Sequence, residues 1–87
     1  MKNWLVTIEV MLHPAILDPQ GKATLYGLKN LGFESIHTVR IGKRIELQIT
    51  AATAADAETI GKEAATKLLA NPVMETFMIQ VHEMQVN

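Results

Sequence analysis

The sequence predicts an α+β protein of the ferredoxin-like class, with element order β-α-β-β-α-β and two helices on one face of an antiparallel sheet. Three observations predict it. Segments near both ends alternate apolar and polar residues, two segments have helical spacing behind clear start signals, and a long β-rich segment separates these helices. The 87 residues are expected to form one domain, 1–87.

The first half of the chain predicts a strand, a helix and a further β-rich segment. The strand covers Asn3 to Leu12 and ends at His13-Pro14, because proline cannot donate to a ladder. The helix starts at Asp18-Pro19, with Asp as N-cap and Pro at the first helical position, and reaches about Leu31. Gly32 suits the left-handed residue that closes a helix.

The β-rich segment runs from Ile36 to Thr50, and its two halves meet at Gly42-Lys43. This dipeptide is compatible with a tight hairpin turn or with a bend in one long strand, and the hairpin is favoured.

The second half predicts one helix and one strand. Thr53 caps a helix that reaches Ala70, and Asn71-Pro72 ends it. Its expected apolar stripe consists of Ala57, Ile60, Gly61, Ala64, Ala65 and Leu68. The last strand covers Glu75 to Val86 and should lie beside the first.

The outward residues of these two neighbouring strands predict an oligomer. They include Leu5, Met11, Met78 and Met84, which is much apolar surface for a free sheet face. We expect a dimer or tetramer, formed through this face or through a strand exchanged at Gly42.

Composition excludes several classes of function. The chain has no cysteine, which excludes disulfides and thiolate metal sites, and His13, His37 and His82 are too far apart for a local metal-ligand pair. The net charge is −1 with no run of like charge, so nucleic-acid and membrane partners are not expected. The start of the sequence enters a strand pattern and not a signal peptide, so a cytoplasmic protein is expected.

No pattern indicates a catalytic site, so the candidates are binding surfaces. Asp18 and Pro19 are explained as a helix start, but glycine in a first helical turn costs about 1 kcal/mol, so Gly21 indicates a close approach by a ligand or another chain. Arg40 and Lys43 flank Gly42 at an exposed turn, where loops commonly carry function. The candidate partner-binding residues are Asp18, Gln20, Gly21, Arg40, Gly42 and Lys43.

Three stretches carry a resemblance: Leu17-Asp18-Pro19-Gln20-Gly21, then Val39-Arg40-Ile41-Gly42-Lys43 with Glu46-Leu47, then Lys67-Leu68-Leu69-Ala70-Asn71-Pro72-Val73. In order and spacing they span nearly the whole chain, which resembles the PurS-type small subunit of phosphoribosylformylglycinamidine synthase.

That resemblance implies a part in a larger enzyme. It implies a non-catalytic subunit that joins a glutaminase to a large synthetase subunit, assists ammonia transfer in purine biosynthesis, and forms homo-oligomers. The whole complex would be an ATP-dependent, glutamine-hydrolysing C–N ligase. ATP and magnesium would be bound by the large subunit, and no cofactor by this chain.

Two other functions belong to different classes. The element order and Asp18-Pro19-Gln20-Gly21 also fit an ACT-like regulatory module that binds an amino acid between subunits, although such modules are usually attached to an enzyme. A single-stranded RNA binder would need a basic face and stacking aromatics, which this sequence lacks.

Overall fold

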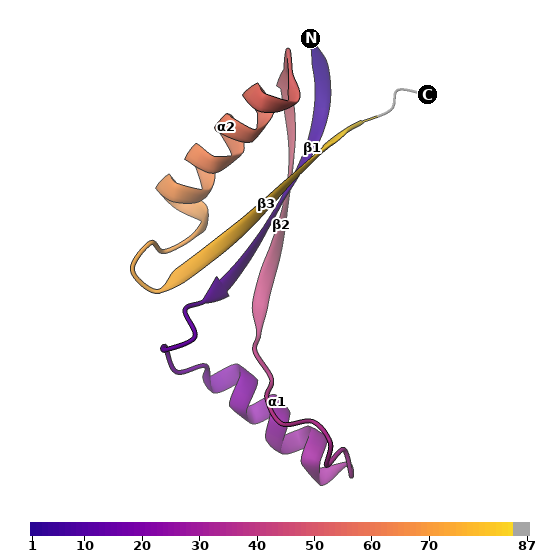
Figure 1. The fold of residues 1–87 in the computed structure, drawn as a ribbon, viewed down its shortest axis with the longest axis vertical. Coiled ribbons are helices and arrows are strands. Elements are labelled where there is room, and N and C mark those ends of the chain that lie inside the picture. The colour runs from indigo at the N-terminus through magenta and orange to yellow at the C-terminus, as the bar shows by residue number, and fades with distance from the viewer. Residues whose placement is uncertain (85–87) are drawn as a thin grey trace.

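The computed structural model describes residues 1–84, and its centre is a three-stranded antiparallel sheet with strand order β2-β1-β3 (Figure 1). The strands are β1 (Lys2–Leu12), β2 (Gly42–Ala51) and β3 (Glu75–Glu83). The antiparallel α+β class is confirmed, as is the pairing of the first and last strands. The predicted end of the last strand, at Val86, lies outside the described residues.

One face of the sheet forms the core beneath helix α2 (Ala54–Ala64). Alternation along β1 turns Trp4, Val6, Ile8 and Val10 toward this helix, and all four are buried. The helix approaches closely because its buried positions are small: a Cβ built on Gly61 would lie 2.8 Å from side-chain carbons of Val6 and Ile79. Thr53 caps the helix as predicted, since its Oγ1 accepts the amide hydrogen of Asp56 at 3.1 Å.

The end of this helix differs from the prediction. Residues Ala65–Leu69 form a π-helical turn (η1), in which the Ala70 amide donates to the Ala65 carbonyl. A π turn holds more residues than an α turn, so the side chains after it are rotated. Ala70 is therefore buried and Leu68 is 83% exposed. The predicted stripe was right for Ala57, Gly61 and Ala65, which are buried, and wrong for Ile60 and Leu68, which are exposed.

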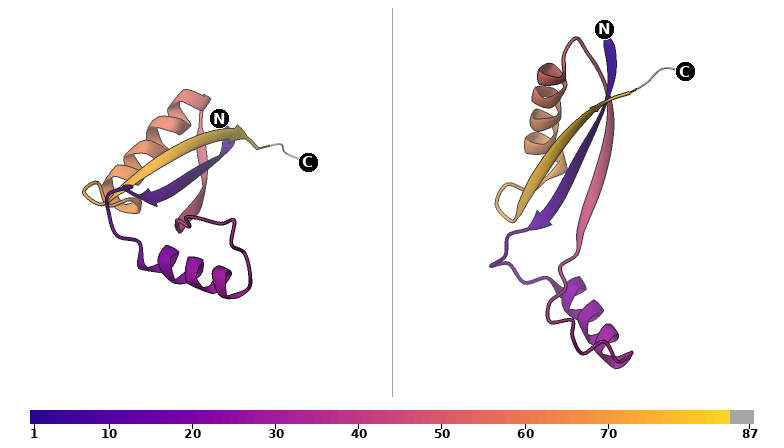
Figure 2. Two further views of the ribbon diagram at one scale, coloured as in Figure 1. Left: turned by 60° about the horizontal axis from the view of Figure 1, so that its bottom comes forward. Right: turned by 45° about the vertical axis from the view of Figure 1, so that its right-hand side comes forward.

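Helix α1 (Pro19–Asn30) stands away from the sheet. The views of Figures 1 and 2 agree that it continues beyond the lower end of the sheet, whereas α2 covers the face. The prediction of two helices on one face was therefore wrong for α1. Helical spacing shows which side of a helix is apolar, but the connecting segments decide what that side covers.

Both ends of α1 have the predicted chemistry. Asp18 Oδ1 accepts the amide hydrogen of Gly21 at 2.9 Å. Gly32 has φ of +96°, and the amide of Phe33 donates to the Leu28 carbonyl, the pattern of a Schellman motif. The two ends of the helix are therefore set by local sequence.

The segment before β2 corrects a second prediction. Residues 36–41 form no strand, and Gly42 is not a hairpin turn but the first residue of β2, opposite Met11. A Cβ on Gly42 would collide with the Met11 side chain and the Val10 carbonyl. The glycine is thus required by the close pairing of β1 and β2. In the part of the chain described, no helix is long and apolar enough to cross a membrane.

Candidate interface at the joint between the sheet and helix α1

The six predicted partner-binding residues lie together where the sheet meets α1. Asp18, Gln20, Gly42 and Lys43 line one cavity of about 310 Å³. Asp18 and Arg40 line a second, of about 500 Å³, with Leu17 and Val39. The two sequence motifs therefore form one structure, which we call the joint: Leu12, Asp18–Gly21 and Val39–Lys43.

Asp18 connects the two segments of the joint. Its Oδ1 caps α1, and its Oδ2 accepts the amide hydrogen of Ile41, 23 residues away, at 2.8 Å. The amides of Ile41 and Gly21, and more weakly the Arg40 guanidinium, hold the pKa of the Asp18 carboxyl below its usual value. Because both oxygens accept backbone hydrogen bonds, this carboxylate is suited to hold two segments together and not to transfer protons.

The close approach predicted at Gly21 is made by the chain itself. Gly21 is the only buried residue of α1, and a Cβ there would collide with the Val39 carbonyl oxygen and with the Asp18 carboxylate. Arg40 is exposed, and it also makes a contact within the chain, because its Nη2 donates to the carbonyl of Leu12 at the end of β1. Asp18, Gly21, Arg40 and Gly42 therefore all have structural roles within one chain.

Gln20, Arg40 and Lys43 are exposed at the joint, but the Arg40 side chain is engaged with Leu12, so Gln20 and Lys43 are the candidates for contact with a partner. Both line the smaller cavity, beside the half-buried Glu75. Their amide and ammonium groups can donate hydrogen bonds to a partner.

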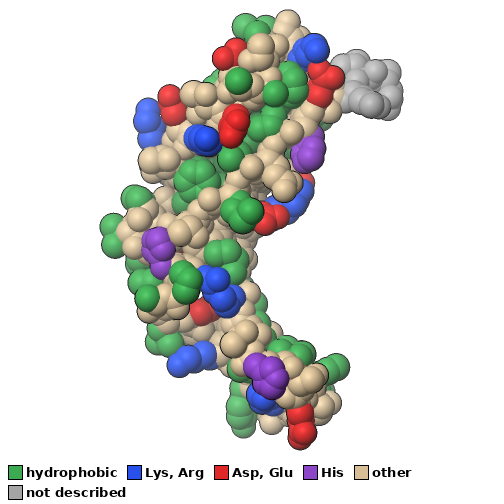
Figure 3. Space-filling model, viewed as in Figure 1, with side chains coloured by type: hydrophobic (Ala, Val, Ile, Leu, Met, Phe, Trp, Pro, Cys, Tyr) green, Lys and Arg blue, Asp and Glu red, His purple; other side chains and the backbone are tan. Residues whose placement is uncertain are grey.

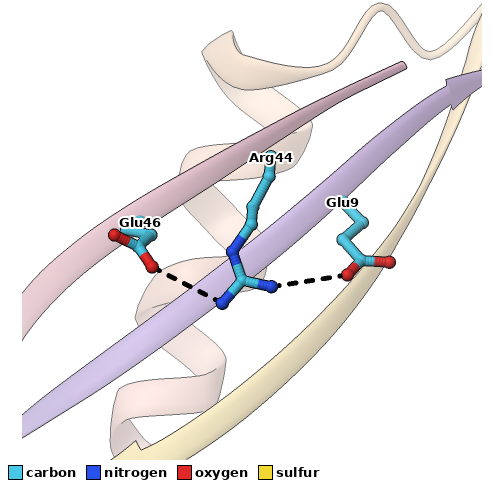
Figure 4. Close-up of polar contacts among 3 residues, drawn as sticks. All are labelled: Glu9, Arg44 and Glu46. Atoms are coloured by element: carbon cyan, nitrogen blue, oxygen red, sulfur yellow. Dashed lines mark hydrogen bonds and ion pairs between the residues drawn. The ribbon is translucent and has the colours of Figure 1, made fainter. Parts of the chain in front are cut away.

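The predicted oligomer face is more polar than its methionines suggested. Leu5, Met11 and Met84 are half-buried on it and Met78 is 68% exposed. Between them, Arg44 lies 3.6 Å from Glu9 and 3.4 Å from Glu46 (Figure 4). These three side chains are about half exposed, so the ion pairs add little stability.

Sequence reasoning missed the apolar side chains around α1. Tyr26, Leu31 and Phe33 are each more than half exposed, as is Leu17 before the helix. Figure 3 shows the end of the molecule that carries α1 bent away from the main body, with apolar side chains on its surface. One signal was present in the sequence: Gly27 and Asn30 in α1 supply too little apolar volume for a helix that covers a sheet.

The three histidines lie on separate segments of the chain. His13 begins the connection to α1, where its amide donates to the Met74 carbonyl, while His37 and His82 are exposed on other segments. Among residues 1–84, no group of three His, Cys, Asp or Glu side chains is placed to hold a metal ion.

Comparisons with known proteins match this fold and sequence. The family model described as "PurS: Phosphoribosylformylglycinamidine (FGAM) synthase" matches residues 5–83. Phosphoribosylformylglycinamidine synthase subunit PurS of Bacillus subtilis is 38% identical over 78 residues, covering 90% of this chain and 92% of the relative.

Solved structures agree over almost the whole chain. PurS of Thermus thermophilus has a TM-score of 0.86 at 37% identity, covering 95% of this chain and 99% of that one. A chain in the structure of PurLQS from Thermotoga maritima has a TM-score of 0.84 at 30% identity, covering 97% of this chain and 100% of that one. The chain therefore belongs to the PurS family, subunits of the FGAM synthase of purine biosynthesis.

Proposed function

We propose that this chain is the non-catalytic small subunit that joins a glutaminase subunit to a large synthetase subunit in a glutamine-hydrolysing FGAM synthase, and that it works in the cytoplasm. The observation that carries the proposal is the joint. Its one carboxylate and its guanidinium are engaged with backbone groups of the same chain, which suits a scaffold and leaves the chemistry to the partners. The related chain in the PurLQS structure supports the same assignment.

Ammonia transfer explains why such a subunit is useful. Free ammonia is lost or protonated in bulk water, so the contact between the two active subunits must exclude solvent. A rigid sheet with helix α1 extending beyond it is suited to span and seal that contact. ATP and magnesium belong to the large subunit in this proposal.

The test is reconstitution of the three subunits from the native host. With this chain present, glutamine-dependent FGAM formation should rise strongly, while the rate with added ammonium salt should change little. Equal glutamine-dependent rates with and without the chain would contradict the proposal.

Gln20 and Lys43 are the partner contacts we propose at the joint. A chain carrying both Gln20→Ala and Lys43→Ala should fold normally, because both side chains are exposed, and should bind the other subunits more weakly. Lys62→Ala on the exposed side of α2 is the matched control. If the double variant and the control co-purify with the partners equally well, the joint is not the docking site.

We propose that a second copy of the chain covers the exposed apolar surface of α1. The radius of gyration is 16.8 Å, against about 12 Å for a compact chain of this length. Twelve residues of isolated helix are marginal in water, so α1 needs a surface to pack on. The sheet face beside α2 offers one, because Phe77, Ile79 and Ile45 are only partly buried there.

Backbone hydrogen bonding supports the same exchange, in which α1 and the segments beside it in one copy pack on the sheet of the other copy. Among the described residues, no backbone–backbone hydrogen bond involves residues 37–40, and β2 and β3 are both edge strands. An extended segment and an open strand edge are complementary, because each has unpaired amide and carbonyl groups.

Sedimentation equilibrium measures the mass directly. We expect a dimer or tetramer that dissociates when Leu28→Asp in α1 is combined with Phe33→Asp in the turn after it, whereas the control Lys29→Asp leaves it intact. A wild-type monomer at micromolar concentration would contradict the exchange.

A further inference from the structure

The helix α1 and the turn after it form an arm, residues 19–35, that is connected to the sheet by two segments. Residues 13–18 lead out from β1, and residues 36–41 lead back into β2. Helix α1 itself has few contacts with the sheet, so the direction of the arm depends on these two segments and on what joins them to each other.

The joint closes them into a ring. Met11 pairs with Gly42 at the end of the sheet, and the Asp18 Oδ2 to Ile41 hydrogen bond joins the same two segments at the base of the arm. The arm cannot turn about either segment alone without breaking one of these two connections.

Two further contacts also hold the returning segment against α1 and β1. The carbonyl of Val39 lies against the bare Cα of Gly21, and the Arg40 guanidinium donates to the carbonyl of Leu12. They place the returning segment directly on the first turn of α1 and on the end of β1. The cap of α1 is therefore also the point at which the second segment is attached.

We infer that Asp18 is a positioning residue, whose second carboxylate oxygen fixes the direction of the arm relative to the sheet. An ordinary N-cap needs one acceptor oxygen, whereas Asp18 uses two, and the second accepts the amide hydrogen of Ile41 in the other segment. The inferred consequence rests on the proposed exchange: a fixed arm reaches the second copy already oriented, which lowers the entropy lost on association.

The substitution Asp18→Asn separates the capping of α1 from the hydrogen bond to Ile41. Asparagine is as good an N-cap as aspartate, but it has one acceptor oxygen, and its amide group would face the second N–H. Asp56→Asn is the matched control, because Asp56 also lies in the first turn of a helix and its carboxylate has no hydrogen bond to the joint.

Two measurements report on the joint itself. The amide hydrogen of Ile41 should exchange at least about tenfold faster in Asp18→Asn than in the wild type, and at an unchanged rate in Asp56→Asn. The chain has no cysteine, so spin labels at Lys29→Cys and Thr59→Cys report one distance between the arm and α2, after dilution with unlabelled chain. The distance distribution should broaden in Asp18→Asn while the helix content stays constant.

Unchanged Ile41 exchange and an unchanged distance distribution in Asp18→Asn would overturn the inference, as would equal broadening in Asp56→Asn. The proposed exchange fails by a different result, the sedimentation of the wild-type chain as a monomer. The two failures are therefore distinguishable.

Discussion

Replacement of Gly21 by alanine tests whether the returning segment really lies on the first turn of α1. A Cβ at this position would lie 2.6 Å from Asp18 Oδ2 and closer still to the Val39 carbonyl oxygen, whereas ordinary contact begins at 3.4 Å. Alanine gains about 1 kcal/mol of helix propensity. Overpacking against backbone costs about 1–3 kcal/mol, and the Asp18 carboxylate is held in place by two hydrogen bonds.

The matched control is Gly27→Ala in the same helix. A Cβ on Gly27 would meet nothing within 4 Å, so this variant receives the propensity gain alone. We expect Gly27→Ala to be more stable than the wild type by up to about 1 kcal/mol. Gly21→Ala should be less stable by about 1–2 kcal/mol, the upper part of the overpacking cost less the propensity gain.

Urea unfolding followed by circular dichroism, at one fixed protomer concentration, measures both variants. At about 4–8 °C per kcal/mol for a domain of this size, thermal midpoints should move in opposite directions. If Gly21→Ala equals or exceeds Gly27→Ala in stability, the close approach of Val39 is absent and the joint is wrongly described.

Three further predictions use the same unfolding assay. The Asp18 carboxyl has a lowered pKa in the folded chain, so the unfolded chain binds more protons at low pH. Stability from this group is present above about pH 4 and lost as pH falls through the folded pKa; in Asp18→Asn this part of the pH dependence should disappear. Ile8→Ala removes a fully buried side chain and should cost about 2–5 kcal/mol in urea unfolding; a loss below 1 kcal/mol would contradict the core assignment. Arg44→Ala should cost less than about 1 kcal/mol, because its ion pairs are exposed, and a larger loss would show that they act as a network.

The elements with strong local signals were predictable from the sequence. Alternation over Asn3 to Leu12 identified the central strand and its buried face, because one side of a strand must be apolar to pack on α2. Asp18, Gly32 and Thr53 identified helix ends, because capping needs only neighbouring backbone groups.

The sequence predicted which residues belong to the candidate site, but not what those residues do there. Gly21 was recognised as a position of close approach and Gly42 was interpreted as a turn or a bend, and the structure shows that residues of the same chain approach both, Val39 and Met11 respectively. A glycine in the sequence indicates that something lies near the backbone, but it carries no information on what that is.

The sequence by itself determined the three strands of the sheet, both ends of α1, the start of α2 and the family, because these depend on local periodicity, capping chemistry and matched motifs. Only the tertiary structure decided that α1 leaves the sheet, that residues 36–41 have no partner strand within this chain, and that Leu68 is turned to the surface by a π turn. The physical reason is that these features depend on contacts between residues distant in sequence, such as Asp18 with Ile41. Helical or strand periodicity describes one side of an element and does not specify which surface it meets.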